Sequence, residues 1–243
     1  MKIIKLDAID STNTFLKELA HNTSLENYTV VTAKSQKKGR GQMGTVWLSE
    51  PGKNLLCSVY VAFKGLLVHD KALLNYAVSL AIVDMLEAMS LPRLAIKWPN
   101  DILSSSAKLC GVLVESVIRG KEIESAIIGI GLNVNQMVFE EHLQKVTSMR
   151  NVMGHIFDLD VVLEKLMRAL ELRIALIGTQ AKPSLKTCYL EKLYKKNIPT
   201  MFRNSSDVLF MGKLINVTSQ GKLQIELEDD SIQEFGIKEV SFA

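Results

Sequence analysis

Residues 108–135 read KLCGVLVESVIRGKEIESAIIGIGLNVN, and this stretch decides what kind of fold the chain adopts. It holds two long apolar runs, Cys110 to Ile118 and Ile123 to Asn135, each rich in Val and Ile. Runs of β-branched residues with this length are typical of strands in a sheet. We therefore predict two long strands here and work outward from them.

The residues before this stretch predict further strands and two helices. Ser11 is a candidate N-cap, because its hydroxyl can accept a hydrogen bond from a free backbone N–H, and apolar residues follow it at helical spacing. The segment from Asp70 to Ala88 is apolar nearly all round, which indicates a helix buried against a sheet. The polar, glycine-rich segment from Lys34 to Gly44 is predicted to be a loop. The predicted strands are Lys2 to Ala8, Thr29 to Ala33, Thr45 to Leu48, Leu55 to Phe63 and Leu94 to Trp98.

The residues after this stretch change character near Lys195. Before that point, Leu159 to Ile177 predicts an amphipathic helix capped by Asp158, and Ser184 to Lys195 predicts another helix. Beyond it, about 50 residues hold only short strands, which suggests a small barrel. These strands are Thr200 to Phe202, Val208 to Val217, Lys222 to Leu227, Ser231 to Phe235 and Glu239 to Phe242. We therefore predict an α+β fold with two domains, residues 1–195 and residues 196–243.

The composition argues against a disordered chain and against a nucleic-acid-binding protein. The chain has 243 residues, of which 47% are hydrophobic and 23% charged, and these values are near the globular average. The 29 Lys and Arg residues exceed the 26 acidic residues by only 3, and they form no long basic run. That excess is too small to predict nucleic-acid binding, so we expect no nucleic-acid partner.

Cysteine usage and hydropathy predict the compartment. The three cysteines, Cys57, Cys110 and Cys188, are odd in number and far apart, which argues against a disulfide framework or a zinc ribbon. The N-terminal residues are interrupted by acids and do not resemble a secretory signal. The most apolar stretch, Ala72 to Met89, contains polar residues and falls short of the ~20 apolar residues that span a bilayer. We therefore expect a soluble, cytoplasmic protein that does not contact a membrane.

The string Gly39-Arg-Gly-Gln-Met-Gly44 fits the pattern of a dinucleotide-binding loop. That fold needs a helix after the glycines and an acidic residue about 20 residues later. Here Thr45 to Leu48 favours a strand, and Lys64 stands at the later position, so a nicotinamide oxidoreductase is poorly supported. A plain mobile loop remains open. We favour a loop that closes over an anion, because Arg40 can pair with a carboxylate or a phosphate.

Two further strings place polar residues beside predicted strands. Lys-Trp-Pro-Asn-Asp at 97–101 lies at the end of a predicted strand, where polar functional residues are common. Taken alone, it also fits a turn in which the Asn and Asp side chains hydrogen-bond to their own backbone. Lys108 leads into a strand that Gly111 interrupts. A strand glycine often marks the close approach of a ligand, and the alternative is a bulge beside a solvated lysine.

Two more strings leave alternatives open. Gly129 and Gly131 alternate along one face of a predicted strand and leave that face bare, so a flat ligand could lie there or a helix could pack closely. Asp-Ser-Thr-Asn at 10–13 is a good helix cap and equally a hydrogen-bonding cluster.

In combination and in this order, the strings resemble the biotin protein ligases. The matching strings are Ser11-Thr12-Asn13, Gly39-Arg40-Gly41, Lys97-Trp98-Pro99-Asn100-Asp101, Lys108-x-x-Gly111-x-Leu113-x-Glu115 and Gly129-x-Gly131-x-Asn133. The tail from Gly221 to Phe242 is similar to the C-terminal SH3-like barrel of that family. The resemblance covers nearly the whole chain.

The resemblance implies a catalytic domain like that of the class II synthetases, with a mixed central sheet, flanking helices and an SH3-like barrel after it. It implies an enzyme that makes biotinyl-5′-AMP from biotin and ATP, with Mg²⁺, and passes biotin to one lysine on the biotin carrier domain of a carboxylase. In the first step the biotin carboxylate meets the α-phosphate of ATP. Cations held in a dry site must offset the repulsion between these two anions.

The resemblance also assigns roles to individual residues. Lys108 and Arg40 are the expected catalytic residues: Lys108 contacts the carboxylate and the α-phosphate, and Arg40 closes over the phosphates. Asp101 is the expected partner of magnesium. The expected biotin site consists of Ser11, Thr12, Asn13, Gln36, Gly39, Arg40, Gly41, Gln42, Lys108, Gly111 and Gly129. The expected ATP site consists of Arg40, Trp47, Trp98, Asn100, Asp101, Lys108, Gly131 and Asn133.

The chain departs from the family at two loop positions. The family often has Arg where Gln42 stands, and Arg or Asn where Thr45 stands. Our hypothesis is that other groups of the loop retain the adenylate in place of the missing charge. We expect the glycine loop and residues 136–150 to become ordered when the adenylate forms. The catalytic-type sequence starts at residue 1, so we expect no N-terminal DNA-binding domain, and an edge strand leaves a homodimer open.

Two rival functions also remain open. A lipoate ligase or lipoyl transferase would share the fold, although the string at 97–101 favours biotin. A non-catalytic biotin-binding module is the second rival, and the presence of Arg40, Asp101 and Lys108 argues against it. A comparison of labelled biotin with labelled lipoate, each with ATP, would distinguish the first rival. Release of pyrophosphate when biotin is added would exclude the second.

Overall fold

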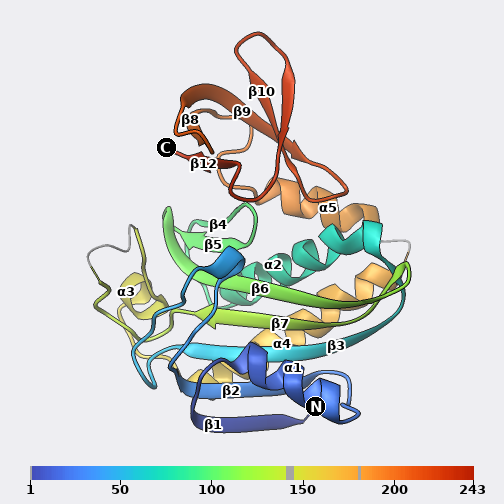
Figure 1. Cartoon of the computed structure of the whole chain (residues 1–243). Helices are drawn as coiled ribbons and strands as arrows, with labels where there is room; N and C mark the ends of the chain where they lie inside the picture. The colour runs from blue at the N-terminus through green and yellow to red at the C-terminus, as the bar shows by residue number, and fades with distance from the viewer. Residues whose placement is uncertain (1, 141–144, 180–181) are drawn as a thin grey trace.

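The computed structural model describes residues 2–140, 145–179 and 182–243, which form two β-sheets with flanking helices (Figure 1). The larger sheet has seven strands in the order β1-β2-β3-β7-β6-β5-β4. These strands are β1 (Ile3–Ile9), β2 (Thr29–Gln36), β3 (Leu55–Leu67), β4 (Leu94–Lys97), β5 (Asp101–Ser104), β6 (Ala107–Arg119) and β7 (Glu122–Leu132). β1 and β2 are parallel, and the other neighbouring strands are antiparallel. The predicted α+β class with a mixed central sheet is confirmed.

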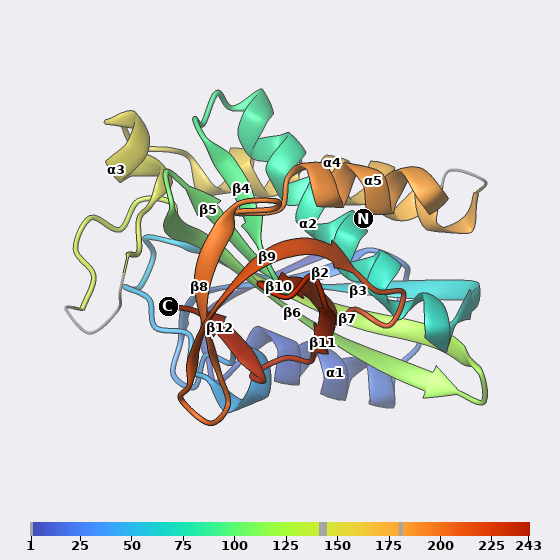
Figure 2. The same ribbon diagram turned by 90° about the horizontal axis from the view of Figure 1, so that it is seen from above.

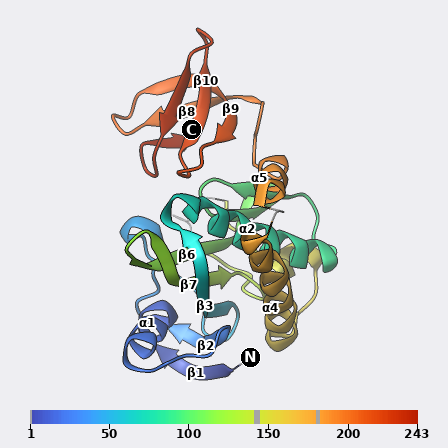
Figure 3. The same cartoon turned by 90° about the vertical axis from the view of Figure 1, so that its right-hand side faces the viewer.

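Helices cover both faces of this sheet. α1 (Thr12–Asn22) connects β1 to β2 on one face, and Figure 3 shows α2 (Lys71–Ala88), α4 (Leu159–Ala175) and α5 (Lys182–Glu191) on the other. Both predicted caps are confirmed, since Ser11 accepts from the backbone of Thr14, and Asp158 accepts from the first turn of α4. Shorter helical segments are η1 (Gln42–Gly44), η2 (Val68–Asp70), α3 (Met149–Met153) and η3 (Leu176–Gly178).

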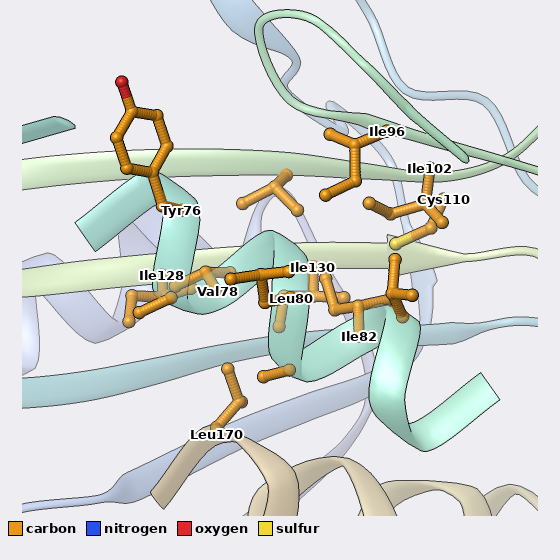
Figure 4. Packing of buried hydrophobic residues seen from close by; sticks show 14 of the residues in the cluster. Tyr76, Val78, Leu80, Ile82, Ile96, Ile102, Cys110, Ile128, Ile130 and Leu170 are labelled. Atoms are coloured by element: carbon orange, nitrogen blue, oxygen red, sulfur yellow. The ribbon is translucent and has the colours of Figure 1, made fainter. Parts of the chain in front are cut away.

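The apolar helix α2 forms the centre of the main core. Figure 4 shows Val78 and Leu80 of α2 close to Ile128 and Ile130 of β7, with Leu170 of α4 nearby. All of these side chains are almost fully buried, so the all-round apolar character of α2 reflects cover from the sheet and from α4 together. Within the residues that the structure describes, none of the helices combines the length and apolar character that a membrane crossing requires.

The second sheet is antiparallel and has five strands in the order β11-β10-β9-β8-β12. Its strands are β8 (Pro199–Asn204), β9 (Leu209–Val217), β10 (Leu223–Leu227), β11 (Ile232–Phe235) and β12 (Val240–Phe242). Figure 2, which looks down from above, shows it over the middle of the larger sheet. Phe202 packs against Phe210 and Phe242 and belongs to the same buried cluster as α2. The division into two domains at 195/196 remains a prediction.

The predicted strand from Thr45 to Leu48 is wrong. The structure has only an isolated bridge there, between Arg40 and Val46. The segment folds back on the glycines instead of joining a sheet, because the backbone N–H of Trp47 donates to the carbonyl of Gly39 at 3.0 Å. The β-branched residues therefore line a short hairpin-like loop.

Several boundaries also differ from the prediction, among them the end of β7 and the start of β5. β7 ends at Leu132 rather than Asn135, because the next residue bonds outside the β7 ladder. The N–H of Asn133 donates to the carbonyl of Leu109, and its carbonyl accepts from the N–H of Met149. No strand was predicted at β5, and the sequence placed Asp101 at the end of the strand before it. A strand of four residues that starts with an acid directly after a proline turn carries too weak a propensity signal to be recognised.

Candidate active site

A cavity of about 420 Å³ lies where the two sheets meet. Its wall combines the glycine loop (residues 39–47), the turn between β4 and β5, the α1-facing side of β6 and β7, and part of the second sheet. Among the described residues, this wall includes every predicted site residue except Gly39 and Asn133. The volume is within the usual range for a small-molecule site. Strings that are far apart in the sequence are therefore brought to one place.

Side chains at one end of the cavity form a hydrogen-bond network in which the groups that line the cavity are neutral, apart from Arg40, whose charge is paired with that of Glu115. Gln36 Oε1 accepts from the backbone N–H of Thr12 at 2.8 Å and from its hydroxyl at 3.0 Å. The Ser58 hydroxyl lies 2.8 Å from Thr12 Oγ1 and 2.5 Å from Asn13 Oδ1. Asn13 Nδ2 donates to Glu115 Oε2 at 3.1 Å. This end, next to the buried Ser11 cap, presents fixed hydroxyl and amide groups that suit a ligand with both N–H donors and a carbonyl.

Two members of this network were not among the predicted site residues. Ser58 lies within the apolar strand β3, and no pattern in the sequence distinguishes it. Glu115 had a usable signal, because strand residues two apart point to the same face, which places Glu115 on the side of Gly111. The period of the strand could therefore have identified Glu115.

Three glycines form the floor of the cavity. Gly111 of β6 pairs with Gly131 of β7, and Gly129 lies two residues further along β7 on the same face. A Cβ at Gly131 would come 2.5 Å from the ring of Trp47, and a Cβ at Gly129 would overlap the side-chain amide of Asn13. The face that the glycines leave without side chains is thus covered by an indole and an amide. The sequence had left two alternatives for this face, a flat ligand or a closely packed helix.

The glycine loop closes on itself as a narrow turn. The N–H of Gly41 donates to the carbonyl of Thr45 at 2.7 Å, beside the bond between Trp47 and Gly39. A Cβ at Gly39 would overlap the carbonyl of Trp47, so this approach requires glycine. The loop thereby holds Trp47 over the floor, while Gln42 begins its tip.

Arg40 points from the loop toward β6 and α1. Its guanidinium donates to both carboxylate oxygens of Glu115 at 3.1 Å and to the Thr14 hydroxyl at 3.3 Å. Burial raises the pKa of Glu115, but the hydrogen bonds from Asn13 and Arg40 outweigh it and hold the pKa below its ordinary value. The structure therefore ties Arg40 to this hydrogen-bonding end of the cavity, where its charge is balanced by that of Glu115.

Opposite charges meet at the other end of the cavity. Lys108 Nζ lies 2.8 Å from Asp101 Oδ1, and both side chains are partly exposed. The same ammonium lies 5.5 Å from the centre of the Trp47 ring. A cation beside an aromatic face suits an anionic ligand that carries a planar group.

The turn before Asp101 is held by hydrogen bonds to β6 and to the second sheet. Asn100 is 8% exposed, its Nδ2 donates to the carbonyl of Val112, and its own carbonyl accepts from the N–H of Val112 at 3.2 Å. Trp98 is also buried, and its Nε1 donates to the carbonyl of Gly221 in the second sheet at 3.0 Å. The backbone that carries the Asp101 carboxylate is thus held by contacts within the protein.

Asn133 lies behind the wall of the cavity. Its Nδ2 donates to the carbonyl of Thr147 at 3.1 Å. Asn133 Oδ1 and Trp47 Nε1 are buried polar atoms that have no partner within the described part of the chain. Buried polar atoms without partners are rare, which makes Nε1 of Trp47, a residue of the cavity wall, a candidate contact for a ligand.

The segment 136–150 approaches Lys108 from the side. Its residues 141–144 lie outside the described part of the chain, so the expectation that this segment becomes ordered with the adenylate remains a prediction. Beyond them, the backbone N–H of Lys108 donates to the carbonyl of Lys145 at 2.6 Å, and the N–H of Thr147 donates to the carbonyl of Lys108 at 2.9 Å. The backbone of Lys108 is therefore held on both sides.

The second sheet supplies a part of the wall that was not predicted. Val240, Ser241 and Phe242 of β12 face the cavity together with Lys238. Lys97 lies 5.6 Å from the centre of the Phe242 ring. Contacts between segments so far apart in the sequence have no period that a single sequence could reveal.

The sequence of this chain is similar to those of known proteins over most of its length. Residues 6–133 match the biotin/lipoate A/B protein ligase family. A Bacillus spizizenii protein named bifunctional ligase/repressor BirA is 31% identical over 242 residues, which cover 98% of this chain and 71% of that protein. A Paracoccus denitrificans protein named biotin–[acetyl-CoA-carboxylase] ligase is 29% identical over 203 residues, which cover 81% of this chain and 83% of that protein.

A solved structure agrees with these sequence matches. The biotin protein ligase from Aquifex aeolicus in complex with biotin and ATP superposes with a TM-score of 0.80 at 26% identity. The superposition covers 100% of this chain and 98% of that protein, so it includes both sheets and the cavity between them.

Proposed function

The chain belongs to the biotin/lipoate A/B protein ligase family, and from this premise we propose that it is a biotin protein ligase. It activates biotin with ATP to biotinyl-5′-AMP and transfers the biotin to a lysine of a carrier domain. One observation carries the proposal: a single cavity joins a neutral hydrogen-bonding end to a charged end at Lys108 and Asp101. Biotin has the same division, with a neutral ureido ring at one end and a carboxylate at the other.

The neutral end would hold the ureido ring. That ring has two N–H donors and one carbonyl, and Ser11, Thr12, Asn13 and Gln36 supply hydroxyl and amide groups around it. A site that pairs all of these groups rejects analogues that lack them, because its own buried groups would then be left unpaired. The open space of the cavity beside the glycine floor would hold the fused rings and the aliphatic tail.

The charged end would hold the reacting anions. A biotin carboxylate oxygen attacks the α-phosphorus of ATP, the new P–O bond forms, and pyrophosphate leaves with the electrons of the broken bond. Lys108, whose ammonium lies at this end of the cavity, would neutralise both the carboxylate and the α-phosphate and so lower the cost of bringing them together. Trp47, Trp98, Asn100, Gly131 and Asn133 would surround the nucleotide, and we retain Arg40 as a proposed catalytic group of the loop.

Magnesium is proposed to enter with ATP as part of the substrate. In the described residues there is no group of three or more His, Cys, Asp or Glu side chains that could hold a metal by themselves. Mg²⁺ often keeps several waters and takes one or two carboxylates together with substrate phosphates. Asp101, a single carboxylate at the charged end, fits that requirement.

The second substrate is proposed to be the biotin carrier domain of a carboxylase. Its lysine amine attacks the mixed anhydride, an amide bond forms, and AMP leaves. The amine must be neutral to attack, so we expect the transfer step to speed up with rising pH. The Paracoccus denitrificans relative is named for the carboxylase on which it acts, which supports this acceptor class.

The test measures pyrophosphate from the full chain with biotin and Mg-ATP and without any acceptor. We expect biotin-dependent pyrophosphate from the wild type and a fall of about 100- to 1,000-fold in Lys108→Ala, the size typical for loss of a charge-stabilising group. Lys165→Ala, which changes an exposed lysine of α4, is the matched control and should behave as the wild type. Pyrophosphate with lipoate but not with biotin would overturn the substrate assignment.

A further inference from the structure

The tip of the glycine loop extends away from the groups that anchor its base. Arg40 at the base is engaged with Glu115 and Thr14 on β6 and α1. The tip follows at Gln42, which is neutral, and Met43, which is 61% exposed. A loop that crosses a cavity in this way needs a second support if it is to stay closed.

The second sheet makes a direct contact with this tip. Lys238 Nζ donates to the backbone carbonyl of Met43 at 2.7 Å, and the two residues are 195 positions apart in the sequence. Both residues have left-handed backbone conformations, with φ of 50° for Met43 and 68° for Lys238. Residues other than glycine adopt this region at a cost, so the turns on both sides of the contact must be held by their surroundings.

The turn that presents Lys238 is rigidly built. Glu239 Oε2 accepts from the N–H of Gly236 at 2.6 Å, and the N–H of Glu239 donates back to the carbonyl of Gly236 at 3.2 Å. The carbonyl of Glu239 accepts from the N–H of Ser205 at 3.0 Å. Lys238 therefore contacts the loop from a turn whose backbone is held in place.

The second sheet is itself fixed to the opposite side of the cavity. Trp98 Nε1 donates to the carbonyl of Gly221, and the Tyr76 hydroxyl donates to the carbonyl of Thr218 at 3.2 Å. The loop tip is thus linked through the second sheet to the turn that carries Asp101. The second sheet thereby bridges the loop and that turn, which share no hydrogen bond within the described part of the chain.

We propose that Lys238 is a positioning residue that holds the glycine loop closed across the cavity, so that the second sheet controls how long the adenylate is retained. The proposal rests on the proposed function only for the identity of the retained molecule. A single ammonium–carbonyl bond at a partly exposed site predicts a change of about five- to tenfold in the rate of loop opening.

The first test needs no ligand. Lys38 and Arg40 are trypsin sites within or beside the loop, and cleavage there reports how often the loop opens. We expect Lys238→Ala to be cleaved about five- to tenfold faster than the wild type, and Lys238→Arg to restore the slow rate because its guanidinium can also donate to the carbonyl. Lys222→Ala removes an exposed lysine from the turn before β10 and should be cleaved at the wild-type rate. Equal cleavage of Lys238→Ala and the wild type would overturn the proposal.

The second test measures retention. The protein is loaded with labelled biotin and Mg-ATP, passed through a desalting column, and followed for loss of label. We expect label to leave Lys238→Ala about five- to tenfold faster, with Lys222→Ala as the control. Faster cleavage without faster loss of label would contradict the retention role. If no adenylate forms in any variant, the proposed function fails while the trypsin test still decides the contact.

Discussion

The two sides of the cavity are built in different ways. On one side, the turn between β4 and β5 is buried, and Asn100 bonds with Val112 through both its side chain and its backbone. On the other side, the glycine loop is exposed, with Val46 at 67%, and contacts between its own glycines and the segment Thr45 to Trp47 hold much of its shape. The first side is a fixed wall, and we expect the second, which is exposed, to open more readily.

This difference separates two requirements of the reaction. Groups that stabilise charge act best when they are fixed before the substrate arrives, because no reorganisation is then needed during the reaction. Ligands must nevertheless enter and leave, and loops secured by a few exposed contacts can provide that access. We therefore expect changes in the fixed wall to alter chemistry or stability, and changes in the loop to alter access and retention.

Among changes that compare the fixed side of the cavity with the loop, the largest effect should come from the glycine floor, which adjoins the fixed wall. Gly129→Ala adds a Cβ that displaces the amide of Asn13 and breaks its contacts with Ser58 and Glu115. We expect kcat/KM for biotin in pyrophosphate release to fall about 10- to 100-fold, as overpacking costs about 1–3 kcal/mol. Gly178→Ala, where a Cβ meets open space, is the control. Wild-type activity in Gly129→Ala would show that the floor is not pre-built.

A second effect should appear in thermal stability. Asn100→Ala removes the bond to the buried carbonyl of Val112, which costs about 1–3 kcal/mol, so Tm should fall by about 3–10 °C for a chain of this size. Gln42→Ala on the loop should leave Tm within about 1 °C, because surface changes away from special contacts are small. Calorimetry of the two variants decides this point. A larger loss in Gln42→Ala would reverse the comparison.

A third, smaller effect should come from the link between the loop and β6. Arg40→Gln and Glu115→Gln each break the paired hydrogen bonds, and the double variant completes a mutant cycle. We expect a coupling of about 0.5–1 kcal/mol in the free energy of unfolding in urea, because the pair is partly exposed. Additive single effects would mean that this ion pair does not anchor the loop.

The smallest effect concerns pH. The pKa of Glu115 is lowered from 4.5 in the folded chain, so its contribution to stability is fully present above about pH 4.5 and is lost as the pH falls through the folded value. The difference in unfolding free energy between the wild type and Glu115→Gln should therefore be constant near neutral pH and shrink below about pH 4.5. Urea titrations at several pH values measure it, and a difference that grows on acidification would contradict the assignment.

Much of the fold was predictable because its elements follow local rules. The long β-branched runs of β6 and β7, the all-round apolar pattern of α2 and the caps at Ser11 and Asp158 each depend on nearby residues only. The strand predicted from Thr45 to Leu48 failed for the opposite reason. Its β-branched composition favours a strand, but its backbone pairs with the glycines a few residues earlier, and this tertiary choice overrides propensity.

The candidate site was predictable where a motif carried it and not elsewhere. The strings around Ser11, Arg40 and Lys108 meet in one cavity, although their roles there remain proposals. Ser58 was missed because an isolated serine in an apolar strand has no distinguishing pattern. Lys238 was missed because its contact spans most of the chain, and only the folded structure shows which turn reaches the loop.

The glycine floor also shapes how this sequence can evolve. Any amino-acid change at Gly111, Gly129 or Gly131 adds a side chain where Trp47 or Asn13 already stands. The alternating residues of the same strands, such as Ile130, face the core and can exchange among aliphatic side chains of similar volume. Along β6 and β7, a tolerance map of random variants should therefore alternate with the period of the strand, with intolerant positions at the smallest residues.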